Sequence, residues 1–237
     1  MLTLVYFNGN TYYSLAIYLA PVGFDPYAME YCTVKRFYFL RYVICTGAIL
    51  FGIYSSVILL PVQRPAALAD TYDKLHVYKT GALKWEDQKN HPLPQDFADM
   101  LGWKEMAQKA GAAFSTLNKE EKKQTVVFCD NYGMAGAINL YREKYNLPEA
   151  YSDNASFLYW LPDQMPMNNL VLITGDQDEM RHDFIKDFSS AILYDSITNP
   201  YAREHGSLII ILKGANDAFR KMFEEKIDQD KKRLTKH

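Results

Sequence analysis

Two aspartates that follow an apolar run are the first residues whose type and spacing suggest chemistry. Asp176 and Asp178 come directly after Asn169–Thr174, which reads NLVLIT. Two carboxylates on one turn can hold a divalent cation that neutralises a diphosphate leaving group. Acidic residues also cap helices, because the helix dipole favours negative charge in the first turn. Capping is the simpler interpretation here, and the stretch 178–183, which adds His182, is more typical of a solvated helix face than of a metal site.

A polar turn earlier in the chain is the second candidate. Asp130, Asn131, Tyr132 and Gly133 follow the apolar run 125–129 and precede a helical pattern. A junction of this kind offers free backbone N–H groups and the positive end of a helix dipole, which suit a phosphate or another anion. The glycine fingerprint of dinucleotide sites is absent. The alternative is a plain strand-to-helix turn in which Asp130 or Asn131 caps the helix.

An aromatic stretch at 151–160 (YSDNASFLYW) is the third candidate. Aromatic faces beside amide groups are a common way to hold sugar rings, which makes Asn154 and Trp160 candidate substrate-binding residues. A core strand with the turn before it explains the same pattern equally well.

Other kinds of site find no support in the composition. The three cysteines and five histidines are scattered, so no metal site, disulfide framework or nucleophile–base arrangement emerges, and no cofactor is predicted. The net charge of −2 and the lack of a basic stripe argue against a nucleic-acid partner.

The elements that must position these residues follow from the hydrophobic pattern of the second half of the chain. Strand-like runs alternate with helix-like periodicity, which indicates a layered α/β domain over 95–237, preceded by a connector at 63–94. Strands are expected at 125–129, 169–174, 191–194 and 207–212. Helices are expected at 97–107, 134–145, 179–188 and 216–226.

The first 62 residues have a different character. Positions 42–62 contain no charged residue, and 21 helical residues span roughly 31 Å, the thickness of the hydrocarbon core of a bilayer. We expect a membrane-spanning helix there; the alternative is a buried core helix. The apolar segment 11–24, interrupted by Pro21, is compatible with a kinked or re-entrant helix, so the membrane segment is 1–62 with one or more helices.

Basic residues give the expected span a direction. Lys35, Arg36 and Arg41 precede it, whereas only Arg64 follows it closely. Positive charge tends to stay on the cytoplasmic side. The sequence therefore predicts a protein of the cytoplasmic (inner) membrane, in contact with lipid, whose α/β domain is extracytoplasmic.

Several segments resemble a known family. The run 93–103, LPQDFADMLGW, is similar to the segment after the last membrane helix of bacterial family 39-type glycosyltransferases, the dolichyl-phosphate-mannose and aminoarabinose-transferase-like proteins. The resemblance extends to about residue 175, and upstream 9–13 is similar to the family's G-K-x-Y-Y stretch. Further matches in the same order are 125–128, 130–133, 135–137, 145–148, Asn154 and Trp160.

The resemblance implies an integral-membrane enzyme of the GT-C type, which transfers a sugar from a polyprenyl-phosphate donor to an acceptor of the cell envelope. The family's catalytic carboxylates lie in its first extracytoplasmic loop, ahead of the part that this chain matches, and Asn10 stands where the family usually has lysine. The chain is therefore expected to be the C-terminal part of such an enzyme, without the catalytic loop and with no catalytic residue assigned. Its substrate-binding candidates are Asp130, Asn131, Tyr132, Gly133, Asn154 and Trp160.

Two other functions are compatible with the residues. One is a non-catalytic, membrane-anchored extracytoplasmic binding domain. The other is a GT-A-type transferase that would use Asp176 and Asp178 to bind a metal and a nucleotide sugar.

Overall fold

The chain divides into two compact units, with the boundary between Val62 and Gln63. The computed structural model describes residues 38–162 and 165–234. The first unit contains α3 (Tyr38–Leu59), a helix of 22 residues on which apolar side chains such as Phe51 are exposed. Among the described residues, no helix has both the length and the apolarity that crossing a membrane requires. The expected apolar segments before residue 38, with Lys35 and Arg36, lie outside the described residues.

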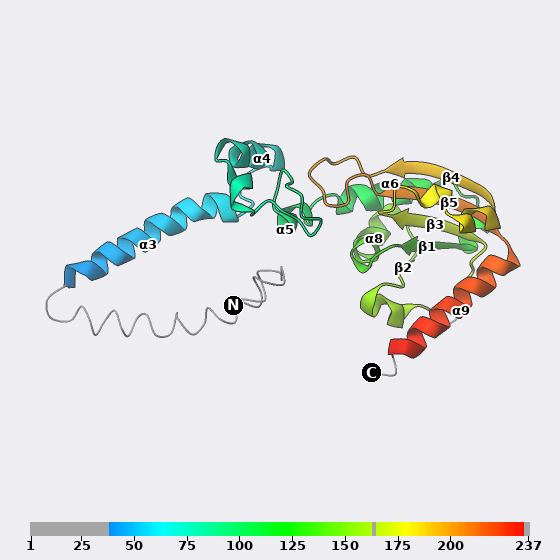
Figure 1. Cartoon of the computed structure of the whole chain (residues 1–237). Helices are drawn as coiled ribbons and strands as arrows, with labels where there is room; N and C mark the ends of the chain where they lie inside the picture. Colours follow the sequence, from blue (N-terminus) through cyan, green and yellow to red (C-terminus); the bar gives the residue numbers. More distant parts are fainter. Residues whose placement is uncertain (1–37, 163–164, 235–237) are drawn as a thin grey trace. The chain divides into compact units, whose positions relative to one another are not determined.

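A five-stranded mixed sheet forms the centre of the second unit (Figure 1), with the strand order β2-β1-β3-β5-β4. β1 pairs in parallel with β2 and β3, whereas β5 runs antiparallel to both β3 and β4. The predicted α/β domain is confirmed, although the two-residue β2 was not predicted and β4 is longer than expected. The strands are β1 (Thr125–Cys129), β2 (Ala150–Tyr151), β3 (Asn169–Thr174), β4 (Phe188–Ser196) and β5 (Leu208–Ala215).

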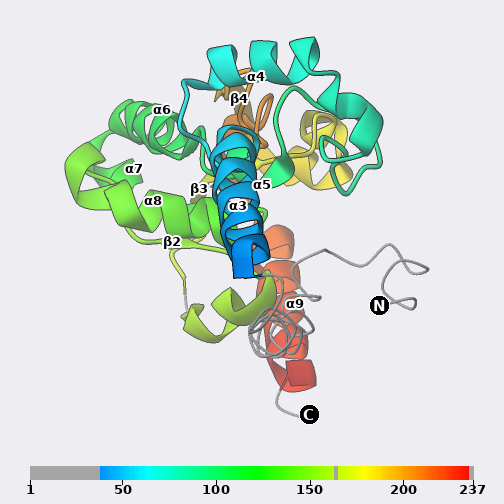
Figure 2. The same cartoon turned by 90° about the vertical axis from the view of Figure 1, so that its left-hand side faces the viewer.

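Alternate side chains of the strands enter two separate cores, because successive residues of a strand point to opposite faces. Val127 and Val171 pack with α6 and α8, whereas Phe128 and Leu172 pack with α9 and η3. Figure 2 shows α6, α7 and α8 grouped together, apart from α9. The bounds are α6 (Trp103–Ser115), α7 (Lys119–Lys123), α8 (Tyr132–Tyr145), η3 (Ala155–Trp160) and α9 (Asp217–Leu234).

The helix predicted at 97–107 is divided in two. α5 (Gln95–Ala98) ends early, and α6 begins only after Gly102, whose φ is +88°. A Cβ atom at Gly102 would lie 2.9 Å from the Cβ of Ala202. Glycine is needed here both for the left-handed backbone and for the close approach. The segment thereby docks onto the loop that joins β4 to β5.

The helix predicted at 179–188 is wrong. Two 3₁₀ turns, η4 (Glu179–Arg181) and η5 (Asp183–Asp187), replace it, with His182 extended between them. β4 already begins at Phe188, and the ring of Phe184 packs on that of Phe219 at 6.0 Å between centroids. Tertiary packing therefore overrides the local charge pattern that favoured a helix.

The stretch 63–94 belongs to the second unit. It contains α4 (Pro65–Lys74) and the 3₁₀ helix η2 (Val77–Thr80). A turn follows, in which Lys84 and Asn90 form an isolated antiparallel β-bridge. Leu68, Tyr72 and Leu93 are buried, so this stretch contributes apolar side chains to the interior of the unit.

Candidate functional site

The carboxyl ends of β1 and β3 lie side by side at the topological switch point of the sheet, where the chain changes the side of β1 on which it adds the next strand. From β1 the chain passes through α8 to β2 on one side, and from β2 through η3 to β3 on the other side of β1. In open α/β sheets, ligands bind in the crevice outside the strand ends at such a switch point. The turn 130–133 and the loop 175–179 both lie at this edge.

Asn131 has a structural role in the first turn. Its side-chain oxygen accepts a hydrogen bond from the backbone N–H of Met134 at 2.9 Å, so it is the N-cap of α8. The capping interpretation is therefore confirmed for Asn131. α8 begins at Tyr132, two residues before the helix that the sequence predicts. The cap uses one of the free N–H groups that an anion would otherwise bind.

Asp130 joins the two strand ends. Its Oδ2 accepts hydrogen bonds from the Thr174 hydroxyl at 2.8 Å and from the Gly175 N–H at 3.0 Å. Its own N–H donates to the carbonyl of Ile173 at 3.0 Å and extends the pairing of β1 with β3. A carboxylate held by protein donors in this way positions the neighbouring loop.

The remaining predicted residues are more exposed. Tyr132 is 56% exposed and Trp160 is 61% exposed. A Cβ at Gly133 would lie 3.1 Å from Oδ1 of Asn131, so the absence of a side chain here leaves room for the cap. Asn154 follows β2, which runs parallel to β1, and it therefore lies toward the same sheet edge. The structure records no hydrogen bond or ring contact between Trp160 and the turn 130–133 within the described residues.

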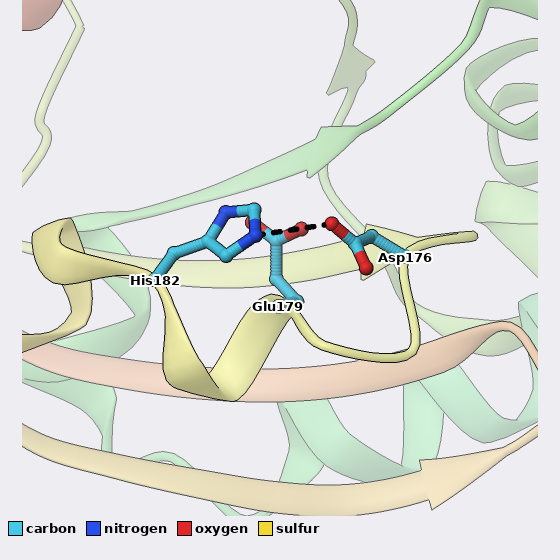
Figure 3. Close-up of side chains that lie close together, drawn as sticks. All are labelled: Asp176, Glu179 and His182. Atoms are coloured by element: carbon cyan, nitrogen blue, oxygen red, sulfur yellow. Dashed lines mark ion pairs between the residues drawn. The ribbon is translucent and has the colours of Figure 1, made fainter.

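A cluster of Asp176, Glu179 and His182 lies in the loop after β3 (Figure 3). Nε2 of His182 is 3.2 Å from Oδ2 of Asp176, and the ligand atoms of all three side chains lie within 4.8 Å of one another. The i, i+3 spacing brings side chains onto one edge of a 3₁₀ turn. One nitrogen and two carboxylates are compatible with a divalent cation such as Zn²⁺. The ion pair of Asp176 with His182 and the hydrogen bond between Thr174 and Glu179 account for the arrangement without a cation.

The two aspartates of the Asp-x-Asp pattern do not converge. Asp176 faces His182, whereas Asp178 forms an ion pair with Arg181. Oδ1 of Asp176 also accepts the N–H of Asp178 at 2.8 Å, which turns the loop. A GT-A-type site would need both carboxylates on one metal ion, so this geometry does not favour that function.

Two carboxyl groups near Asp130 have raised pKa values. Burial raises the pKa of Glu179, and the negative charges of Asp130 and Asp176 raise it further. The hydrogen bond from Thr174 lowers this pKa but does not cancel the rise. Burial also raises the pKa of Glu204, although the hydrogen bond from the Ser207 hydroxyl and the positive charge of Arg203 both lower it. The Thr174 hydroxyl lies within hydrogen-bond distance of both Asp130 and Glu179 but has one hydrogen to donate. Negative charge is thus concentrated at this edge, and it suits a ligand that donates hydrogen bonds.

Cys129 takes no part in covalent chemistry. Its side chain is fully buried at the end of β1, and burial together with Asp130 raises the pKa of the thiol far above its usual range. A thiol in such surroundings stays protonated and unreactive.

Sequence reasoning missed Thr174 and Glu204. Thr174 ends a predicted strand and looks like an ordinary β-branched core residue, but its hydroxyl lies between Asp130 and Glu179. Glu204 is distant in the chain, and the hydrogen bond from Nε2 of Gln177 to the carbonyl of Gly206 at 2.7 Å shows that the two loops adjoin. The topological switch point is the signal that would have directed attention to Thr174.

No family model, curated protein or solved structure matches the chain.

Proposed function

We propose that the chain forms part of an integral-membrane glycosyltransferase that takes its sugar from a polyprenyl-phosphate donor and transfers it to an acceptor of the cell envelope. In this proposal the α/β domain binds substrate and performs no bond-breaking step. It lies on the extracytoplasmic side of the membrane, as Lys35, Arg36 and Arg41 before the expected span predict.

One observation carries the proposal: several of the described segments with the family resemblance meet at the switch point. The stretch 125–136 forms β1, the polar turn and the start of α8. The ring of Trp103 lies 3.5 Å from a Cβ at Gly133, and that of Phe157 lies 4.0 Å from a Cβ at Gly136. Within the described residues, Trp103 and the matched stretch 125–137 therefore adjoin at the edge where open sheets bind ligands.

The second candidate is a membrane-anchored binding domain without a transferase activity. The interactions of the site carboxylates are compatible with this function. Asp130 accepts a hydrogen bond from the Thr174 hydroxyl, and Asp176 forms an ion pair with His182. Both carboxylates are thus fixed by protein groups, which is compatible with a site that orients a ligand.

A donor-retention experiment separates the two functions. The full chain is reconstituted into vesicles, a radiolabelled polyprenyl-phosphate sugar is added, and the label that is captured with the affinity-tagged chain is counted. The transferase proposal expects the donor lipid to be retained in preference to the same polyprenyl phosphate without sugar. Equal retention of both lipids would refute it, and retention of a free envelope glycan alone would favour the binding domain.

The membrane association has its own test. α3 presents exposed apolar side chains, including Tyr42 and Phe51, each 71% exposed, and such a surface calls for an apolar cover. We expect the chain to remain with the membrane fraction after alkaline carbonate extraction. Protease added outside intact spheroplasts is expected to digest the α/β domain, and release by carbonate or full protection from protease would contradict this placement.

A further inference from the structure

A hollow of the α/β domain is lined by residues other than those of the Asp176, Glu179 and His182 cluster. It has a volume of about 170 Å³ and is formed by the turn after η2 together with the loop between β4 and β5. Pockets for drug-sized ligands hold roughly 300–1,000 Å³, so this cavity suits a smaller molecule of one ring. Its lining includes Trp85, His91, Pro92, Tyr201, Arg203 and His205.

One wall is a pair of flat rings held in place. The rings of Trp85 and His91 stack at 3.6 Å between centroids with 9° between their planes. The indole N–H of Trp85 donates to the carbonyl of Leu93 at 2.8 Å, and Nε2 of His91 lies 3.0 Å from the Asp87 carboxylate. Because both rings are fixed from behind, they lose little freedom when a ligand binds.

The opposite wall is the loop 199–205, tied down from several sides. The N–H of Arg203 donates to the carbonyl of Ala98 at 3.2 Å, and its guanidinium pairs with Glu86 at 3.0 Å and with Asp99 at 3.3 Å. The carboxylate of Glu105 accepts from the N–H and the hydroxyl of Thr198, just before the loop. The cavity is therefore part of the rigid fold.

The charges around the cavity do not select an anion. The single guanidinium is already paired with two carboxylates, and His91 is paired with a third, that of Asp87. The planar rings and Pro92 offer apolar faces to C–H groups, whereas Tyr201 and His205 bring groups that hydrogen-bond to hydroxyls. A neutral ring that carries several hydroxyls matches both features.

We propose that this cavity binds one neutral monosaccharide unit, namely a sugar of the acceptor glycan. The assignment of that sugar to an acceptor rests on the proposed function, but the sugar site itself does not.

Saturation-transfer NMR on the full chain in detergent micelles tests the site. Neutral hexoses, 6-deoxyhexoses, pentoses and N-acetylhexosamines are each titrated, with glucose 6-phosphate and inorganic phosphate as anionic probes. We expect transfer to at least one neutral sugar and none to the anions. Tyr201→Ala and His205→Ala should each weaken binding about tenfold, which corresponds to about 1.4 kcal/mol. His205 is exposed, so its variant is expected to fold even if that of Tyr201 does not.

Tyr194→Ala is the matched control, because Tyr194 is a tyrosine on β4 that is 38% exposed and does not line the cavity. It should leave binding unchanged. Absence of transfer to every neutral sugar, preferential binding of an anion, or equal loss in the Tyr194 variant would each overturn the proposal. Sugar binding without donor-lipid retention would remove the transferase function while leaving the sugar site intact.

Discussion

Replacing Glu105 by glutamine should destabilise the domain in a pH-dependent way. Burial alone would raise the pKa of Glu105, but the hydrogen bonds from the Thr198 N–H and hydroxyl and from Lys109 outweigh it and lower the pKa to about 2. The carboxylate thus binds α6 to the segment just before the cavity loop. The drop from 4.5 to about 2 corresponds to roughly 3 kcal/mol at about 1.4 kcal/mol per pKa unit.

Solvent reduces that figure, because the Glu105 side chain is 25% exposed. We expect Glu105→Gln to lower the free energy of unfolding at pH 7 by about 2 kcal/mol. The folded-state pKa is depressed, so the contribution is fully present above the unfolded pKa of 4.5 and disappears as the pH falls toward 2. The difference between wild type and variant should therefore shrink over that window.

Urea unfolding of the full chain in detergent, followed by tryptophan fluorescence at several pH values, measures this difference. Glu120→Gln is the control, because Glu120 is 77% exposed and its ion pair is with Lys123 on the same short helix. Its effect should be within about 0.5 kcal/mol. A loss at Glu105 as small as in this control, or a loss that persists unchanged at pH 2.5, would refute the reasoning.

Three further variants test other parts of the structure. Gly102→Ala should lower the free energy of unfolding in urea by about 1–3 kcal/mol, because the new side chain strains the backbone and contacts Ala202. Gly81 has φ +81° and open space around it, so Gly81→Ala should cost only the strain. Equal losses in the two variants would contradict the close approach of Gly102 to Ala202. Asn131→Ala should cost about 1 kcal/mol in the same assay by removing the cap of α8, and Asn131→Asp should retain most of it. Glu179→Gln should raise the thermal midpoint at pH 7 by about 1–2 °C, because the raised pKa of this carboxyl makes its ionised form unfavourable in the folded state and costs stability as the pH rises. A lower thermal midpoint in that variant would contradict this reasoning, because it would show that the ionised Glu179 carboxylate stabilises the fold.

The sequence predicted the central strands because their signal is strong and local. Thr125–Cys129 and Asn169–Thr174 are short, continuous apolar runs, and both form strands with the expected bounds. β2 has only two residues, too few for a periodic pattern, and it exists because Val127 and Phe128 offer it a partner. The break at Gly102 also escaped detection, because it depends on Ala202, which is a hundred residues away.

The candidate site was predictable only in the part that is contiguous in the chain. The turn 130–133 was placed at the start of a helix, and Asn131 was one of two predicted caps. The partners of Asp130, which are Thr174 and Gly175, come from another strand. The walls of the sugar cavity come from 85–93 and 200–205, and no spacing rule joins two segments so far apart.

The sheet ends in two unequal edges, and the longer one affects how the protein behaves at high concentration. β2 ends one edge with two residues, whereas β4 ends the other with nine. The side chains of Ile192 and Leu193 on β4 are 48% and 51% exposed. An edge strand with exposed apolar side chains can pair with strands of other chains and start aggregation. A bulge between Leu193 and Asp195, and the ion pair of Asp195 with Lys109, interrupt that edge. Removal of the ion pair should therefore lower solubility before it lowers stability.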